Sequence, residues 1–156
     1  MADIVSPEVR SRMMAGIRGK NTKPELLLRH GLHALGFRFR LHGKNLPGRP
    51  DIVFPKHRAV IFVHGCFWHG HDCPLYRLPA TRTEFWRQKI TRNKNVDIRV
   101  EQAIEALGWR QGVVWECALK GRHRRPLSQV IQKCAVWLLS TNKRMKVRGK
   151  MNKPRR

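Results

Sequence analysis

Acidic residues are scarce in this chain of 156 residues: ten Asp and Glu stand against 33 Lys and Arg, giving a formal net charge of +23. Such an excess of one sign opposes folding because like charges repel within the compact state, and a polyanionic partner explains it most simply. We expect nucleic acid as that partner first, and an anionic membrane surface second.

Long apolar runs are also missing, and none approaches the roughly 20 residues needed to span a bilayer. The first residues lack the pattern of a secretion signal, so we expect a cytoplasmic protein. Cysteines number only four, and in a reducing compartment they favour metal binding or free thiols over disulfides. A chain of this length without internal repeats is expected to form one domain with its own core.

The hydrophobic pattern predicts an α/β fold, a mixed sheet flanked by helices, in the order α-β-β-β-α-β-α. Three strands are expected to form an antiparallel meander, and a fourth follows a long helix and is therefore parallel to its neighbour. Capping boxes mark the starts of two helices. The expected elements are a helix over 22–36, strands over 37–42, 51–54 and 59–64, a helix over 81–107, a strand over 111–115 and a helix over 130–138.

Charge divides the chain into three segments. Residues 1–20 are expected to form a basic N-terminal segment whose helix starts at Ser6 and Pro7. This helix is either a solvated arm or an arm that clamps DNA. Residues 21–139 hold the predicted sheet and helices. Residues 140–156 contain no acidic residue and are expected to form a basic disordered tail that binds phosphates without sequence preference.

The apolar segment 60–63 ends in a loop rich in Cys, His and aromatic side chains. Three cysteines and one histidine offer a set of donors that suits a closed tetrahedral structural zinc site, with buried or free thiols as the alternative. The cysteines are Cys66, Cys73 and Cys117. Spacing alone leaves open whether His69 or His71 is the fourth ligand. Cys134 lies in an apolar helix and is expected in the core.

Asp51 stands at the start of a predicted strand. A carboxylate there can hold a divalent ion rigidly, or it can form a surface ion pair with a nearby arginine. The adjacent strand ends at His64, and together with His69 it supplies imidazoles that can move a proton near neutral pH. Asp97, on the long helix, forms either an ordinary surface ion pair or orients a catalytic histidine. Glu25 is explained as part of a helix-capping box.

Four ordered motifs lie between about Ser11 and Trp137. They are LPGRPD at 46–51, HGCFWH at 64–69, PATRTEFW at 79–86 and VWECAL at 114–119. Together they resemble the very short patch repair (Vsr-type) DNA mismatch endonucleases. The resemblance implies a restriction-endonuclease-like core with a structural zinc site, spanning the endonuclease domain at 21–139.

The resemblance also implies an activity. Such an enzyme is a Mg²⁺-dependent, strand-specific DNA endonuclease that nicks on the 5′ side of the thymine in T:G mismatches. These mismatches arise where 5-methylcytosine has deaminated, and the nick initiates very short patch repair. The implied partner is double-stranded DNA with a T:G mismatch, bound by a monomer associated with the nucleoid, with other repair proteins as further partners.

Residue roles follow from the same resemblance. Asp51 and the backbone carbonyl of Val63 are implied to hold the catalytic Mg²⁺, and His69 to transfer a proton. The implied supporting catalytic residues are His64, Asp97 and Glu25. The implied Zn²⁺ ligands are Cys66, His71, Cys73 and Cys117. The side chains implied to wedge into the base stack are Phe67, Trp68, Trp86 and Met14.

The usual glutamate-x-lysine sequence of this nuclease fold is absent, because Phe62-Val63-His64 occupies that strand. An imidazole must therefore replace the lysine. Position 63 is Val where the family pattern predicts Thr, a change that a carbonyl ligand survives. The alternative to an enzyme is a non-catalytic, zinc-stabilised binder of distorted duplex DNA, which has no use for the convergence of Asp51, His64 and His69. An RNA-binding protein would instead stack single-stranded bases on its aromatic side chains.

Overall fold

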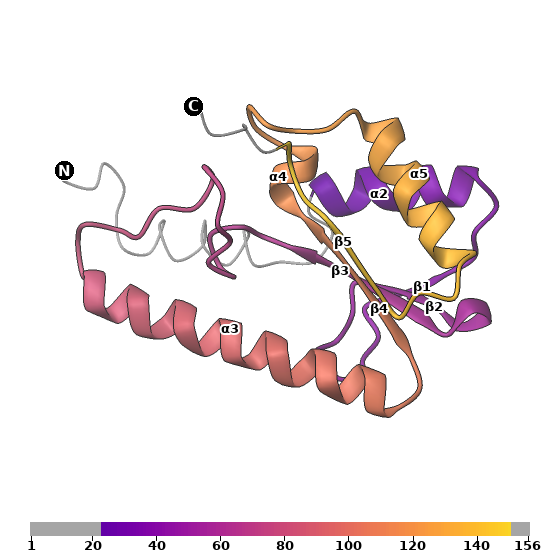
Figure 1. The fold of residues 1–156 in the computed structure, drawn as a ribbon, viewed down its shortest axis with the longest axis horizontal. Coiled ribbons are helices and arrows are strands. Elements are labelled where there is room, and N and C mark those ends of the chain that lie inside the picture. The colour runs from indigo at the N-terminus through magenta and orange to yellow at the C-terminus, as the bar shows by residue number, and fades with distance from the viewer. Residues whose placement is uncertain (1–22, 151–156) are drawn as a thin grey trace.

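A five-stranded mixed sheet with helices on both faces organises residues 23–150, the part of the chain that the computed structural model describes (Figure 1). The strands follow one another across the sheet in sequence order. The elements are α2 (Lys23–Ala34), β1 (Arg40–Leu41), β2 (Ile52–Phe54), η1 (Pro55–His57), β3 (Ala59–His64), α3 (Thr83–Ala106), β4 (Arg110–Trp115), α4 (Glu116–Leu119), α5 (Leu127–Leu138) and β5 (Arg144–Val147).

Strand pairing follows the prediction. β1, β2 and β3 pair antiparallel, which confirms the meander. β3 and β4 pair in parallel because α3 returns the chain to the starting end of the sheet. Their register sets His64 beside Trp115. The residues that follow these two strands therefore emerge at the same end of the sheet.

Two hydrophobic layers enclose the sheet, because successive strand side chains point to opposite faces. In β2, Ile52 and Phe54 belong to the layer beneath α2 and α5, whereas Val53 belongs to the layer beneath α3 (Figure 1). Cys134 is fully buried in the first layer, as predicted. The predicted α/β class, with a mixed sheet flanked by helices, is confirmed. Within residues 23–150, no helix combines the length and apolar character required to cross a bilayer.

The residues after α5 differ from the prediction. Arg144–Val147 form β5, which pairs in parallel with β4, so the disordered tail predicted from residue 140 is wrong for this segment. Val147 is only 1% exposed, and Met145 packs against the same layer. Arg144 forms ion pairs with Glu101 and Glu105 of α3. The sequence analysis missed this strand, whose apolar and charged side chains alternate within a basic segment.

Helix α3 also departs in detail. It begins at Thr83, two residues later than predicted, and runs to Ala106. The predicted capping box at 81–84 is wrong, because Arg82 precedes the helix with a φ of 53° and no side chain caps the first turn. The Thr83 hydroxyl instead donates to the carbonyls of Pro79 and Ala80, at 2.8 Å and 2.9 Å. Strand β1 is shorter than predicted, with two residues.

Candidate active site and metal cluster

Asp51 lies at the start of β2 and faces the end of β3. The backbone N–H of Val63 donates to its Oδ2 atom over 2.6 Å. Burial raises the pKa of Asp51 to about 6, and the nearby charge of Glu25 acts in the same direction, while that of His69 opposes it. Asp51 is therefore a poorly hydrated carboxyl group whose charged form would gain from a nearby cation.

Glu25 and His42 complete a group around Asp51. Glu25 is only 2% exposed, and its Oε1 lies 3.5 Å from Nη1 of Arg29 and 3.8 Å from Nε2 of His42. One ligand-type atom from each of Glu25, His42 and Asp51 lies within 4.8 Å of the others, close enough to share a metal ion. Glu25 thus does more than start a helix, and His42 is a member that the sequence analysis missed.

His64, His69 and Asp97 form a second group. The rings of His64 and His69 stack at 3.8 Å with an interplanar angle of 3°. Nδ1 of His69 lies 2.7 Å from Oδ2 of Asp97 on α3. Burial lowers the pKa of His64 well below its usual range, and the charges of His69 and His71 add to this effect. A neutral His64 can stack on His69 without like-charge repulsion.

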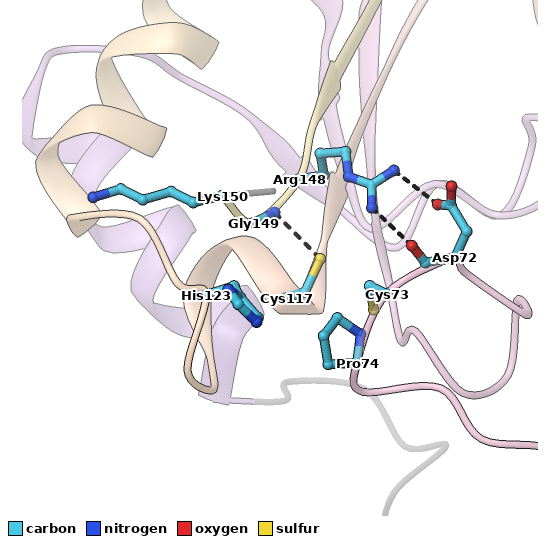
Figure 2. Close-up of a pocket in the computed structure, with 8 residues that line it drawn as sticks. All are labelled: Asp72, Cys73, Pro74, Cys117, His123, Arg148, Gly149 and Lys150. Carbon is cyan, nitrogen blue, oxygen red and sulfur yellow. Dashed lines mark hydrogen bonds and ion pairs between the residues drawn. The ribbon is translucent and has the colours of Figure 1, made fainter. Parts of the chain in front are cut away.

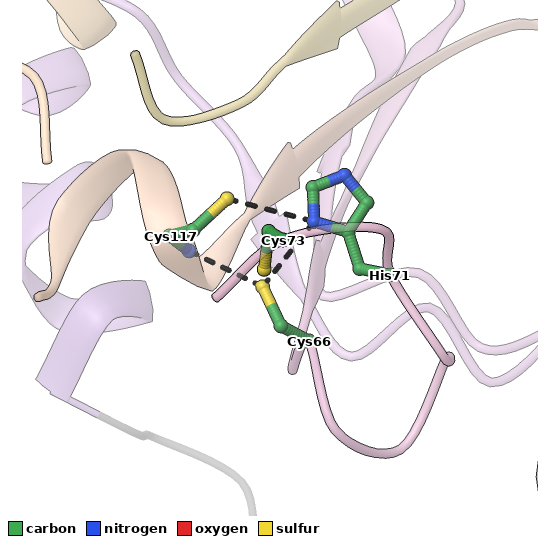
Figure 3. Close-up of side chains that lie close together, drawn as sticks. All are labelled: Cys66, His71, Cys73 and Cys117. Atoms are coloured by element: carbon green, nitrogen blue, oxygen red, sulfur yellow. Dashed lines mark hydrogen bonds between the residues drawn. The ribbon is translucent and has the colours of Figure 1, made fainter. Parts of the chain in front are cut away.

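A third group gathers the four residues implied as zinc ligands, whose donor atoms all lie within 4.8 Å of one another: Cys66, His71, Cys73 and Cys117. Figure 3 shows these side chains pointing toward one another. Nδ1 of His71 lies 3.6 Å from the sulfur of Cys66 and 3.5 Å from that of Cys117. The structure brings His71 into this cluster and places His69 beside Asp97. This Cys/His cluster could bind zinc.

Burial raises the pKa of the Cys66 and Cys117 thiols. Thiolates are good ligands for a metal cation, and a bound cation would offset the cost of ionising these two buried thiols. Backbone N–H groups already point at two sulfurs. Cys117 donates its N–H to the sulfur of Cys66 over 3.3 Å, and Gly149 donates to the sulfur of Cys117 over 3.2 Å. The residues therefore fit a tetrahedral thiolate-rich metal site.

Trp115 lies between the Cys/His cluster and the pair His64 and His69, and the sequence analysis did not assign it a site role. Its ring stacks on His71 at 4.0 Å with an interplanar angle of 8°, and it meets His64 edge-on at 5.2 Å. The only sequence signal was its position two residues before Cys117. Since β4 runs parallel to β3, the end of β4 brings Trp115 between the two groups.

Three of the implied wedge residues, all half-buried, lie together where the loop after β3 meets α3. Phe67 and Trp68 have ring centroids 5.1 Å apart, and Trp86 of α3 lies 5.3 Å from Phe67. Asn93 of α3 donates to the carbonyl of Trp68 over 2.8 Å, which anchors the loop to the helix. The fourth wedge residue, Met14, lies outside the described residues, as does the basic helix at 1–20.

These groups define a class of site. A buried carboxylate beside carboxylate-oriented imidazoles, on a strongly basic chain, is suited to cleaving a phosphodiester bond with a divalent metal. An aromatic cluster at the rim of the same loop is suited to contacts with bases.

Sequence comparison then identifies the family. The profile described as DNA mismatch endonuclease Vsr matches residues 2–75. The chain is 55% identical over 119 residues to the type II nicking enzyme V.XorIIP of Xanthomonas oryzae pv. oryzae, covering 76% of this chain and 88% of that protein. It is 44% identical over 138 residues to the DNA mismatch endonuclease Vsr of Escherichia coli, covering 88% of each chain. The chain belongs to the DNA mismatch endonuclease Vsr family, and it is a DNA endonuclease.

Proposed function

We propose that this protein nicks one DNA strand on the 5′ side of the thymine in a T:G mismatch, in a Mg²⁺-dependent reaction that initiates very short patch repair. The observation that carries the proposal is the convergence of Asp51 with the His69–Asp97 pair at one end of the sheet. Within the pair, Nδ1 of His69 lies 2.7 Å from Oδ2 of Asp97. A protein that only binds DNA has no need of this arrangement.

Asp51 and the backbone carbonyl of Val63 would hold the Mg²⁺, with Glu25 and His42 beside them. When bound, the ion supplies charge stabilisation at the scissile phosphate and lowers the pKa of its bound water. Asp51 accepts the Val63 N–H over 2.6 Å, which fixes the carboxylate against β3. The family resemblance further supports a restriction-endonuclease-like core for this sheet.

His69 would accept the proton of the attacking water. Asp97 lies against Nδ1, so the Nδ1–H tautomer is favoured and Nε2 is left as the proton acceptor. Once His69 is protonated, Asp97 stabilises the imidazolium. The stacked, neutral His64 holds the His69 ring in its plane without adding a competing charge. His64 and Asp97 are therefore positioning residues for the proton acceptor.

Mismatch selectivity would come from the aromatic cluster at Phe67, Trp68 and Trp86, joined by Met14 from the basic first helix. A T:G step is easier to unstack than a matched step, so side chains that wedge into the stack favour the mismatch. The net charge of +23 supplies phosphate affinity that does not depend on sequence. We propose that a monomer acts on nucleoid DNA, with other repair proteins as further partners.

A structural Zn²⁺ held by Cys66, His71, Cys73 and Cys117 belongs to the same proposal. The ion would stabilise the loop that carries His69 and Trp68, because its ligands flank both residues in the sequence. The donor set and the buried thiols of the cluster support this role.

The test is incubation of a T:G duplex, labelled on each strand in turn, with Mg²⁺, followed by mapping of the products. We expect one nick, 5′ of the mismatched thymine. Asp51→Asn should abolish nicking and leave affinity for the mismatched duplex within about threefold, since the loss concerns the reaction and not the contact. Wild-type binding without any nick would instead establish the alternative, a zinc-stabilised binder of distorted duplex DNA.

A further inference from the structure

Strand β5 and the residues that follow it lie beside the Cys/His cluster. Residues 144–150, here called the strap, consist of β5 and the three residues that follow it. Figure 2 shows Arg148 and Gly149 of the strap beside Asp72, Cys73 and Cys117. The end of the strap is fixed independently, because the N–H of Lys150 donates to the carbonyl of His123 over 2.7 Å.

Arg148 forms hydrogen bonds to Asp72, which lies between two members of the Cys/His cluster in the sequence. Its Nη1 donates to Oδ1 of Asp72 over 2.7 Å, and its Nη2 donates to the Asp72 carbonyl over 2.9 Å. Asp72 separates His71 from Cys73 in the sequence. Two-point binding of this carboxylate and carbonyl therefore fixes the backbone that carries both donors.

Asp72 in turn faces the histidine of the cluster. Its Oδ1 lies 3.6 Å from Nε2 of His71, whereas Nδ1 of His71 faces the sulfurs of Cys66 and Cys117. A carboxylate on the far nitrogen favours the tautomer whose near nitrogen can bind a metal, and it fixes the ring orientation. Arg148, Asp72 and His71 thus form a chain from the strap to the cluster.

Gly149 meets the cluster from the other side. Its N–H donates to the sulfur of Cys117 over 3.2 Å, which stabilises a thiolate there. A Cβ at this position would lie 2.6 Å from the carbonyl oxygen of Cys117 and 2.9 Å from that of His123. Only glycine allows the strap to approach this closely, so a larger residue must push the strap away.

A cavity of about 150 Å³ opens beside the sulfur ligands, and strap residues form part of its wall (Figure 2). Its lining includes Cys73 and Cys117 together with Arg148 and Gly149. Displacement of the strap would remove part of this wall and widen the cavity beside Cys73 and Cys117.

We propose that the strap retains the structural zinc: Arg148 positions His71 and Cys73 through Asp72, and Gly149 positions Cys117 through its N–H. This inference rests on the zinc site of the proposed function, and it gives the C-terminal segment a task apart from DNA binding. Arg148 and Gly149 are positioning residues and not ligands.

The test is the zinc affinity of the full-length protein, measured by competition with a colorimetric chelator after the zinc content has been determined. Removing a group that orients a ligand typically weakens metal affinity by about 10- to 100-fold. We expect losses in that range for Arg148→Gln and Asp72→Asn. The loss in the double variant should be smaller than the product of the two single losses, because the two side chains share one contact. Lys146→Gln, an exposed position on β5, is the matched control and should retain wild-type affinity.

Gly149→Ala should also weaken zinc binding. If Gly149→Ala fails to fold, Arg148→Gln still tests the proposal. Unchanged zinc affinity in Arg148→Gln and Asp72→Asn would overturn the strap while leaving the zinc site and the nicking proposal intact. Wild-type protein without stoichiometric zinc would overturn the zinc site and the strap together. Weakened zinc binding in a protein that nicks no T:G duplex would support the strap and contradict only the proposed reaction.

Discussion

Replacing the proposed metal-binding carboxylate should make the magnesium-free protein more stable. Asp51→Asn keeps the size of the side chain and an oxygen that can accept the Val63 N–H, but it removes a charge that folding buries. Functional groups held for a ligand commonly destabilise the fold that carries them. We therefore expect this variant to gain stability and to lose nicking activity.

The magnitude follows from the pKa values. The pKa of Asp51 is raised from 3.8 to about 6 by burial, so the folded protein binds this proton more tightly than the unfolded chain does. The contribution of this carboxyl group to stability is consequently greatest below pH 3.8, falls as the pH rises from 3.8 to about 6, and is lowest above pH 6. A tenfold difference in proton binding corresponds to about 1.4 kcal/mol, so the charged carboxylate destabilises the fold by about 3 kcal/mol at neutral pH and above.

The assay is urea unfolding of zinc-loaded wild type and variant in magnesium-free buffer. The free energy of unfolding of Asp51→Asn should exceed that of wild type by about 3 kcal/mol at a pH of about 8, and this difference should shrink to about half at a pH of about 5. Saturating Mg²⁺ should stabilise the wild type alone. The control is Glu84→Gln, an exposed carboxylate on α3, whose effect should be small at both pH values. A variant no more stable than wild type, or a gap independent of pH, would refute the reasoning.

Three further outcomes are expected. His69→Ala should lower the single-turnover rate constant of nicking by about 10²- to 10⁴-fold, and Asp97→Asn should lower it by less, because the imidazole remains. Trp68→Ala should weaken binding to T:G duplex by about 10- to 100-fold in fluorescence anisotropy, and binding to matched duplex by less, since base stacking contributes about 1–3 kcal/mol. Arg110→Ala should lower the free energy of unfolding in urea by about 2–3 kcal/mol, because its guanidinium donates to five backbone carbonyls.

The parts of the fold that the sequence predicted are those where one pattern decides the outcome. A long helix between two apolar strands requires them to run parallel, and this alone brings Cys66 and Cys117 to the same end of the sheet. Burial of the two strands on both faces made their apolar runs easy to recognise. The placement of the cysteines therefore followed from topology, without knowledge of any side-chain contact.

The missed features depend on contacts between distant segments. Strand β5 was hidden because only Met145 and Val147 face the core, while Arg144 is held by two carboxylates of α3 that no local pattern connects to it. His42 and Trp115 join their sites through backbone pairing and ring stacking across separate strands. Local residue types and spacing cannot specify such pairings, since each depends on which strands become neighbours.

The loop after β3 explains why a metal cluster and a candidate active site occupy the same end of the sheet. This loop runs from Gly65 to Cys73 and places Trp68 and His69 between Cys66 and His71. The aromatic side chains of this loop, Phe67 and Trp68, are only half-buried, so burial of apolar surface contributes little to fixing the loop's conformation. Bonds from one ion to residues on both sides of the segment would constrain it from within, while Asn93 holds the carbonyl of Trp68 from α3. A bound ion would therefore allow His69 to be held rigidly against Asp97 while Phe67 and Trp68 on the same loop stay only half-buried.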